Sequence, residues 1–372
     1  MNSSSSTPPK SNRAVKNKKS GKGKAMNEKG GRRPLKNRKA LWIMLPLTVI
    51  VIIGVIIVAP YVVTSSAHAA IIKIPAKATE KNLRDTLERY FDPAYAGRTF
   101  DAFRKLGRTP AERYGAYEIP KGTSPLQAAR ILSRGMQTEL SLTINGVREL
   151  DSFLPRIAAK LNFKSADLAT LLADSATMAL YGLTPEQAPA LFLNDTYRFY
   201  WTATPEEVVK KLGANYNRFW NETNRKKAEA LGLTPAEVVI VASITDEETQ
   251  AQQEKGRIGR LYINRLHKGM RLQADPTVKF ALKDFSIKRI TGQHLSAPGP
   301  YNTYRVNGLP PGPIRTTSTA TIQAILDSAP SEDLYMCAKE DFSGTHNFAT
   351  TFEEHKENAR RYQQALDERG IK

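Results

Sequence analysis

Cysteine is almost absent from this sequence: its 372 residues include only Cys337, so no disulfide can form within the chain. Histidine is scarce too, with five scattered residues and no His-Glu-x-x-His pair. His346 and His355 lie nine residues apart without a third ligand motif, so we expect no metal site. A Gly-x-Ser-x-Gly elbow and a glycine-rich phosphate loop are also missing. These absences argue against metal, serine-hydrolase and nucleotide chemistry.

Acidic residues are few, 36 against 55 Lys and Arg, which gives a net charge of +19. Residues 1–40 hold thirteen of the basic residues and one acid, Glu28. This tail is rich in Ser, Gly and Asn and has no hydrophobic period, so it is predicted to be disordered. A basic tail could bind nucleic acid, but its place directly before an apolar stretch argues for a membrane role, with no nucleic-acid partner.

The apolar stretch covers residues 41–63 and contains no charge. About 20 apolar residues suffice for a helix to span a bilayer. The basic block before it predicts a cytoplasmic N-terminus and an exported remainder, with Trp42 and Tyr61 near the two interfaces. A cleaved signal peptide is the alternative, because Ala67-His68-Ala69 resembles a cleavage site, but the apolar core exceeds the usual 7–15 residues. We therefore predict a single-pass protein of the cytoplasmic membrane with its catalytic part outside.

The remainder has enough hydrophobic residues for two modest domains or one large one, and its pattern is α+β. Residues 71–145 are predicted to form a small unit, with strands at 70–74, 115–119 and 138–144 and helices starting at Thr79 and Ser124. Residues 146–233 are predicted to be a mainly helical connecting region. Thr204-Pro205-Glu206-Glu207 opens one of its helices as a capping box. Residues 234–372 would form an α+β domain.

This last region opens with a strong helix start at Thr234, Pro235 and Glu237, followed by apolar residues on all sides. Three acids close the helix: Asp246, Glu247 and Glu248. At about 100° per residue, Glu248 shares a face with Val241 and Ile244, whereas Asp246 points nearly opposite.

Contact with apolar side chains raises the pKa of a carboxyl group, as a general acid requires. We expect the charges of Asp246 and Glu247 to raise the pKa of Glu248 further. The alternative is that the three acids merely end a helix on a solvated face.

Polar side chains with the chemistry of a sugar-binding cleft follow this helix. Residues 271–278 are predicted to be a cleft-lining loop, stiffened by Pro276, and 308–313 is a stiff non-helical segment. Amide, carboxylate, hydroxyl and aromatic groups on rigid segments suit the hydroxyls and amides of sugars. The predicted substrate-binding residues are Gln273, Asp275, Thr277, Tyr301, Asn302 and Tyr304.

Five ordered segments give the chain a resemblance to a known family: ASITDEET (242–249), INRLHKGMRLQADPTV (263–278), YNTY (301–304), GLPPGPI (308–314) and HNF (346–348). In this order and spacing they resemble the motifs of the YceG-like endolytic murein transglycosylases. The family pattern A-S-I-x-E-K-E-T places its catalytic Glu on Glu248. Here Asp246 replaces the first Glu and Glu247 replaces the Lys, which puts in doubt any tuning role of that Lys.

The resemblance implies an enzyme with one catalytic carboxylate and no metal or organic cofactor. Glu248 would cleave the bond between N-acetylmuramic acid and N-acetylglucosamine in nascent peptidoglycan strands, leave a 1,6-anhydro end and terminate elongation. It also implies that residues 71–145 are a LysM-like module, and cell-wall synthases are candidate partners. Two alternatives stay open: a hydrolytic muramidase in which Asp246 or Asp275 activates water, and a non-enzymatic peptidoglycan-binding membrane anchor.

Overall fold

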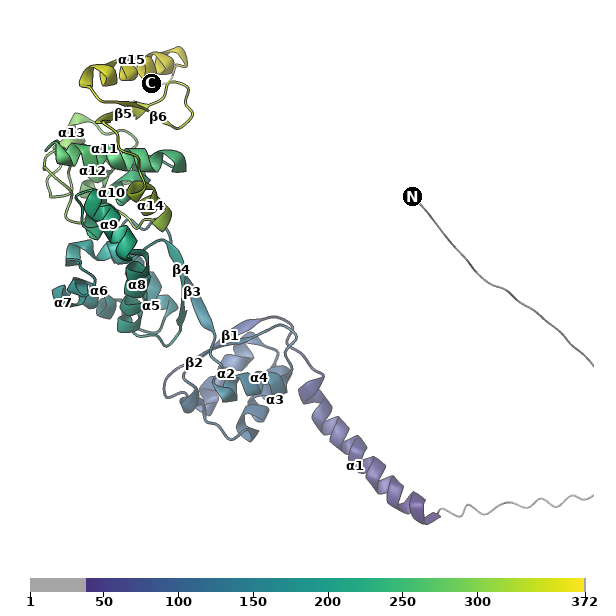
Figure 1. Ribbon diagram of the computed structural model, residues 1–372. Helices are drawn as coiled ribbons and strands as arrows, with labels where there is room; N and C mark the ends of the chain where they lie inside the picture. Colours follow the sequence, from purple (N-terminus) through teal and green to yellow (C-terminus); the bar gives the residue numbers. More distant parts are fainter. Residues whose placement is uncertain (1–37, 371–372) are drawn as a thin grey trace, which may run out of the picture. The chain divides into compact units, whose positions relative to one another are not determined.

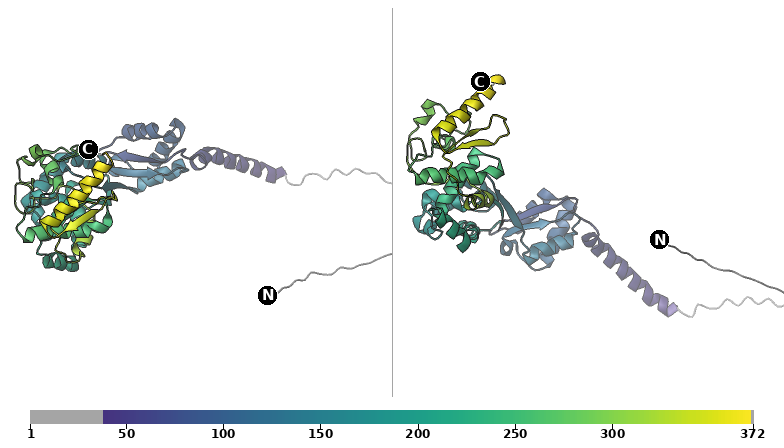
Figure 2. Two further views of the ribbon diagram at one scale, coloured as in Figure 1. Left: turned by 90° about the horizontal axis from the view of Figure 1, so that it is seen from above. Right: turned by 45° about the horizontal axis from the view of Figure 1, so that its top comes forward.

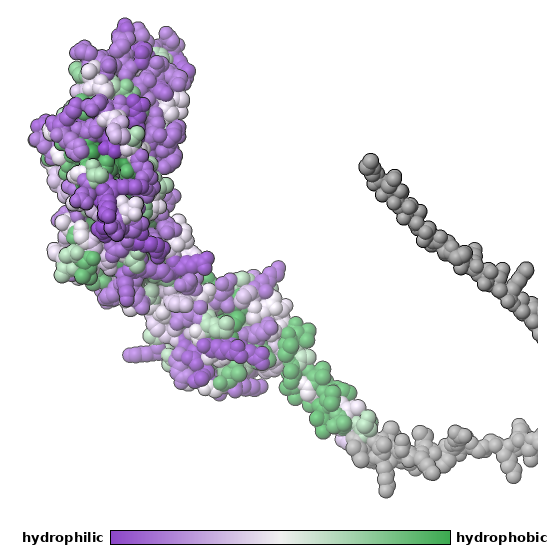
Figure 3. Space-filling model, viewed as in Figure 1, coloured by the Kyte–Doolittle hydropathy of each residue, from purple (hydrophilic) through white to green (hydrophobic). Residues whose placement is uncertain are grey.

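The computed structural model describes residues 38–370, so residues 1–37 of the predicted basic tail lie outside the described residues. The chain divides into two units, one ending at Ile57 and one running from Val58 to the C-terminus. Helix α1 spans Arg38–Val62, starting three residues before the predicted apolar segment. From Met44 to Val62 it has a mean hydropathy of 2.6, and its hydrophobic side chains are exposed (Figure 3). This is consistent with a single-pass membrane anchor.

The first folded part after α1 has the order β-α-α-β-α (Figure 1). Its elements are β1 (Ala70–Ile74), α2 (Glu80–Tyr90), α3 (Pro93–Lys105), a 3₁₀ turn (Pro110–Arg113), β2 (Gly115–Ile119) and α4 (Pro125–Arg134). Strands β1 and β2 pair antiparallel, with Ala70 opposite Ile119. Thr79 and Ser124 both form capping boxes at the predicted helix starts. We call this part, residues 70–135, the small unit.

The third strand predicted for this part forms, but it does not join the β1–β2 sheet. Strand β3 (Glu139–Ile144) pairs antiparallel with β4 (Asp195–Tyr200), which falls in the region predicted to be mainly helical. Every second residue of β3 is buried, and Tyr197 and Phe199 of β4 supply matching buried side chains. The predicted boundary at residue 145 therefore separates β3 from its partner strand in the same sheet, since β4 begins more than fifty residues later.

The rest of the chain is mainly helical around one hydrophobic core. Its elements are α5 (Leu150–Lys160), α6 (Ser165–Ala173), α7 (Ser175–Ala179), a 3₁₀ segment (Pro185–Leu191), α8 (Pro205–Phe219), α9 (Glu222–Ala230), α10 (Pro235–Glu248), a 3₁₀ turn (Gln252–Glu254), α11 (Lys255–His267), α12 (Asp275–Leu282), α13 (Gly292–Leu295), α14 (Thr319–Leu326), β5 (Tyr335–Ala338), β6 (His346–Ala349) and α15 (Phe352–Glu368). Strands β5 and β6 form an antiparallel hairpin, against which α15 packs (Figures 1 and 2).

Helix α10 is the central element of this core and begins at the predicted cap. The Thr234 hydroxyl accepts a hydrogen bond from the Glu237 backbone, and the Glu237 carboxylate accepts one from the Thr234 backbone. Every residue from Val238 to Asp246 is buried, so the helix is surrounded by protein. It ends because Thr249 adopts an extended backbone conformation, which leaves Glu248 as the last helical residue.

The segment after α11 differs from its prediction. Residues 271–278 are predicted to be a loop, but α12 begins at Asp275 with Pro276 in its first turn. Proline is well tolerated there because the first backbone N–H groups of a helix have no partner inside it. Only the stretch from Arg271 to Ala274 remains non-helical.

Candidate functional site

Glu248 lies at the C-terminal end of α10, where the buried helix reaches a cavity. The Tyr262 hydroxyl of α11 donates a hydrogen bond of 2.6 Å to Glu248 Oε1. The same cavity, of about 190 Å³, is lined by Glu248, Leu261, Tyr262, Arg265, Gln273, Asp275, Tyr304 and Met336. The fold therefore surrounds one carboxyl group with mainly polar side chains from several elements.

Three of the six predicted substrate-binding residues share this cavity with Glu248: Gln273, Asp275 and Tyr304. The Tyr304 hydroxyl donates to Asp275 Oδ1 at 2.6 Å, which fixes the two side chains relative to each other. Gln273 has a positive φ of 48°, an uncommon conformation for a non-glycine residue, and its backbone N–H donates to the Thr303 carbonyl. The backbone is thus held so that the Gln273 side chain reaches the cavity.

The other three predicted residues lie outside the cavity lining. Thr277 is fully buried and donates to the Ala274 carbonyl, and its oxygen lies 2.8 Å from the Thr303 hydroxyl. Asn302 is also fully buried and donates to the carbonyls of Leu295 and Ala297.

Tyr301 packs on Phe280, with ring centroids 4.7 Å apart. All three side chains support the segments that carry Gln273, Asp275 and Tyr304, and none of them lines the Glu248 cavity.

Burial raises the pKa of Glu248 from 4.5 to about 6. Desolvation is the main cause, and the negative charge of Asp275 acts in the same direction. The Tyr262 hydrogen bond and the electrostatic interactions of Glu248 with His346 and Arg265 partly oppose this rise. A pKa of about 6 leaves a useful fraction of the acid protonated near neutral pH, as general acid catalysis requires.

The two neighbouring acids, Asp246 and Glu247, each pair with cationic side chains of the protein. The Glu247 carboxylate pairs with Arg148, at 2.7 and 2.8 Å, and with Arg315 at 2.9 Å. Neither Glu247 nor Asp246 is among the main causes of the shift in the pKa of Glu248; the acid among them is Asp275. The expectation that the adjacent charges tune Glu248 was therefore wrong, because the helix directs both away and each charge has its own cationic partner.

Asp246 is buried, with 5% of its surface exposed, and lies on the side of α10 away from Glu248, as its helical position predicts. Its carboxylate pairs with Lys255 Nζ at 2.7 Å and accepts hydrogen bonds from the Thr321 and Thr317 hydroxyls. This pair joins α10 to α11 and α14. Because its carboxylate is bound by protein groups on all these sides, Asp246 has a structural role.

Comparisons with known proteins identify the family of this chain. The sequence model of the YceG-like family matches residues 72–361. The chain belongs to the YceG-like family. It is similar to an endolytic murein transglycosylase of Bacillus subtilis, at 29% identity over 47% of this chain and 48% of the relative. A second relative, an endolytic murein transglycosylase of Streptococcus pneumoniae, is 24% identical over 41% of this chain and 27% of the relative.

A crystal structure of a yceG-like protein from Listeria monocytogenes shares the fold. It superposes with a TM-score of 0.51 at 25% identity and covers 78% of this chain and 99% of that chain. The chain spans less than half the length of the curated relatives it matches. The fold is thus that of a YceG-like protein.

Sequence reasoning about this YceG-like chain missed Tyr262 and Arg265, although both line the cavity. They lie three residues apart on α11 and so share a face, and Arg265 also falls within the segment 263–278 that carries the family resemblance. The Arg265 guanidinium is held by the carbonyls of Leu334 and Leu272, each at 2.6 Å. His346, whose Nδ1 lies 2.9 Å from Glu254, joins β6 to the turn that follows α10.

A tyrosine-to-phenylalanine change tests the role of Tyr262. Tyr262→Phe removes the hydrogen bond that lowers the pKa of Glu248, so this pKa should rise. Because the acid acts in its protonated form, the alkaline limb of kcat/KM should move to higher pH. Tyr301→Phe is the matched control, since its ring lies outside the cavity, and it should leave the profile unchanged. A limb that moves to lower pH in Tyr262→Phe would contradict the assignment.

Two small residues hold the 308–314 segment of this YceG-like chain in place, one through α10 and one through the 3₁₀ segment Pro185–Leu191. The Ser243 hydroxyl accepts a hydrogen bond of 3.1 Å from the Ile314 backbone. A Cβ added at Gly312 would lie 1.9 Å from the Glu186 carbonyl oxygen, so only glycine fits without a backbone shift. Ser243 thus acts through a hydrogen bond and Gly312 through close packing.

Gly312→Ala is therefore expected to lower stability by about 1–3 kcal/mol or more, the usual cost of overpacking. The measurement is the midpoint of thermal unfolding. Gly97→Ala, in α3, is the control: no atom lies within 4 Å of the added Cβ, and the helix should gain up to about 1 kcal/mol. Equal midpoints for the two variants would show that the Gly312 contact relaxes freely.

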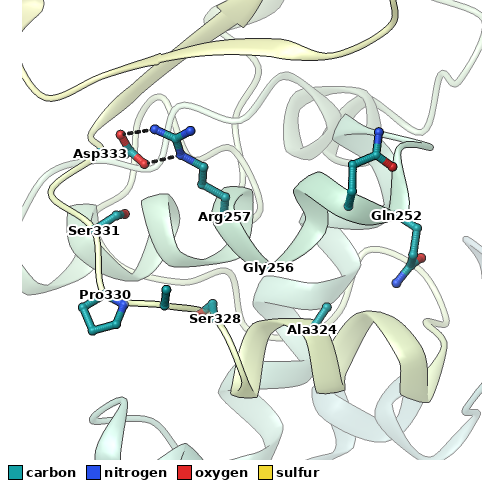
Figure 4. Close-up of a pocket in the computed structure, with 10 residues that line it drawn as sticks. Gln252, Gly256, Arg257, Ala324, Ser328, Pro330, Ser331 and Asp333 are labelled. Carbon is teal, nitrogen blue, oxygen red and sulfur yellow. Dashed lines mark hydrogen bonds and ion pairs between the residues drawn. The ribbon is translucent and has the colours of Figure 1, made fainter.

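A second depression of about 510 Å³ lies on the other face of α11 (Figure 4). Arg257 and Asp333 form a bidentate pair there, with Nε–Oδ2 and Nη2–Oδ1 distances of 2.7 and 3.0 Å. Arg257 precedes Tyr262 by five residues, so the two point to different sides of the helix. No group of His, Cys, Asp and Glu suited to a metal occurs in the described part of this YceG-like chain, His346 and His355 included.

Proposed function

We propose that this YceG-like chain is an endolytic lytic transglycosylase that cleaves the β-1,4 bond between N-acetylmuramic acid and N-acetylglucosamine in peptidoglycan strands. The observation that carries the proposal is the position of Glu248 in a polar cavity at the end of a buried helix, where its pKa is raised to about 6. The names of the two relatives support the same reaction class.

Glu248 would carry both proton transfers of the reaction. The protonated acid gives its proton to the glycosidic oxygen as the bond to the muramic acid C1 breaks, so the leaving sugar departs as an alcohol. The resulting carboxylate takes the proton from the muramic acid 6-hydroxyl, whose oxygen bonds to C1 and closes the 1,6-anhydro ring. Glu248 ends as it began, protonated, and no water is consumed.

The surroundings of Glu248 suit these steps. The Tyr262 hydroxyl binds Oε1, while Oε2 makes no hydrogen bond within the described part of the chain. Tyr262 therefore orients the carboxyl group and leaves one oxygen for the proton. Gln273, Asp275 and Tyr304 supply amide, carboxylate and hydroxyl groups for the sugar and its N-acetyl substituents.

One observation favours a second reaction in the same cavity. Asp275 lies there with Glu248 and could activate water, as paired carboxylates do in glycosidases. Asp246, the other candidate base, is buried in its own ion pair on a different face of α10. A hydrolytic muramidase would thus depend on Asp275.

Product analysis separates these functions. The full chain in detergent should release fragments from purified sacculi that end in 1,6-anhydro sugars, one water lighter than reducing ends, as measured by mass spectrometry. Reducing ends that disappear in Asp275→Asn would establish the muramidase instead. Retention on sacculi without soluble fragments would mean a wall-binding anchor.

The arrangement at the membrane belongs to the same proposal. The basic tail and α1 would anchor the chain with a cytoplasmic N-terminus and an extracytoplasmic catalytic part. The small unit, with its β-α-α-β order, would be a LysM-like module that contacts glycan, and cell-wall synthases would be partners at nascent strands. A reporter that is active only outside the cytoplasm should be active when it is fused after Lys372. Activity of a cytoplasm-only reporter fused at the same position would overturn this arrangement.

A further inference from the structure

Four arginines surround a depression in the small unit. The depression has a volume of about 450 Å³ and lies at the C-terminal ends of α3 and α4. Its lining consists of Leu106, Arg108, Arg113, Arg130, Ser133 and Arg134. No acidic residue lines it, and we refer to it as the arginine pocket.

The charges of the arginine pocket lack protein partners. Three other cations of the small unit form ion pairs, in Lys81–Asp85, Arg84–Glu88 and Arg104–Glu80. Within the described residues none of the four arginines of the pocket forms an ion pair. Arg130 and Arg134 are also four residues apart on α4, a spacing at which like charges destabilise a helix. An anion bound between these charges would relieve their mutual repulsion.

One guanidinium of the pocket is already held in place. Arg113 Nε donates to the Ser133 carbonyl at 2.7 Å, and its Nη1 donates to the Glu112 carbonyl at 3.0 Å. Its planar group is thus oriented before any ligand arrives, which reduces the entropy lost on binding. Arginine forks match the oxygen geometry of phosphate, and several of them around one depression favour a phosphate group over a neutral sugar.

The rim of the pocket also carries an exposed leucine, Leu106, and the residue before it contacts Tyr61, a tyrosine at the end of the membrane helix. Leu106 is 41% exposed on the rim. The preceding residue, Lys105, places Nζ 5.2 Å from the ring centroid of Tyr61, within the unit that starts at Val58. Tyr61 is the second-last residue of α1, and tyrosines at the ends of apolar helices lie at the level of the lipid headgroups.

From these observations we propose that the arginine pocket binds the phosphate of an anionic phospholipid headgroup, with Leu106 contacting the acyl region. The combination of unpaired arginines, an exposed leucine and a neighbouring interfacial tyrosine fits a lipid better than a soluble phosphate. Such a contact would hold the small unit at the bilayer surface.

Lipid binding by the full-length chain in detergent tests this site, with native mass spectrometry as the readout. Phosphatidylglycerol should bind to the wild-type chain, and Arg108→Gln/Arg134→Gln should weaken binding by about thirtyfold, from the usual contribution of two basic residues near anionic lipid. Both side chains are exposed, so the fold should tolerate the change. Arg156→Gln/Arg218→Gln removes two other exposed arginines with the same change in charge and should bind like the wild type.

Each remaining outcome is decisive. Equal affinity of the two double variants for phosphatidylglycerol would overturn the site. Equal binding of diacylglycerol, which lacks a phosphate, would show that only the apolar surface of α1 holds lipid. Displacement of phosphatidylglycerol by inorganic phosphate at similar concentration would identify a soluble anion as the ligand and overturn the lipid assignment.

Discussion

Glu248→Gln should reduce release of fragments from sacculi by about a thousandfold, within the range of 10²–10⁴ typical of a lost general acid. The amide cannot give a proton to the glycosidic oxygen, although its shape preserves the cavity. The measurement is kcat and KM separately on isolated glycan strands, because a loss of binding alone would raise KM and leave kcat unchanged.

Glu248→Gln should lower activity but raise stability at alkaline pH. Measuring both distinguishes loss of the general acid from misfolding. The pKa of Glu248 rises from 4.5 to about 6 on folding, so its stabilising contribution is complete below pH 4.5 and is lost as the pH rises through 6. Gln carries no charge, so at pH 8 the free energy of unfolding of the variant should exceed that of the wild type by up to about 2 kcal/mol. An inactive variant with a lower thermal midpoint at pH 8 would indicate misfolding instead.

Asp246→Asn should destabilise the chain by about 3–5 kcal/mol, the usual cost of removing one partner of a buried ion pair. Lys255 would be left with an uncompensated charge, since 12% of its side chain is exposed. The activity of the molecules that remain folded should change little, because Asp246 does not line the Glu248 cavity. Thermal unfolding and kcat at a temperature well below the midpoint measure the two effects separately.

The control for this prediction removes both charges. Asp246→Asn/Lys255→Met leaves no unpaired buried charge and should recover part of the stability lost in the single variant. A single variant as stable as the wild type would mean that solvent reaches Lys255. Loss of kcat in the fully folded single variant would return Asp246 to the reaction and favour a second carboxylate.

The sequence by itself determined the features that depend on neighbours along the chain. The capping box at Thr234 and the apolar run after it specify α10, and its periodicity places Glu248 and Asp246 on different sides of the helix. An uncharged stretch of sufficient length likewise specifies the single candidate membrane helix in the described chain. Helix starts and helix faces repeat over a few residues, so they can be read locally.

Only the tertiary structure decided which groups meet across long separations. Glu247 contacts Arg148, ninety-nine residues away, and Asp246 contacts Thr321, seventy-five away. The same holds for β3 and β4, and for Thr277 and Asn302, whose hydrogen-bonding groups are satisfied inside the protein. A polar side chain in a favourable pattern binds substrate only if folding leaves it without internal partners. That condition depends on how distant segments pack, and no local pattern contains it.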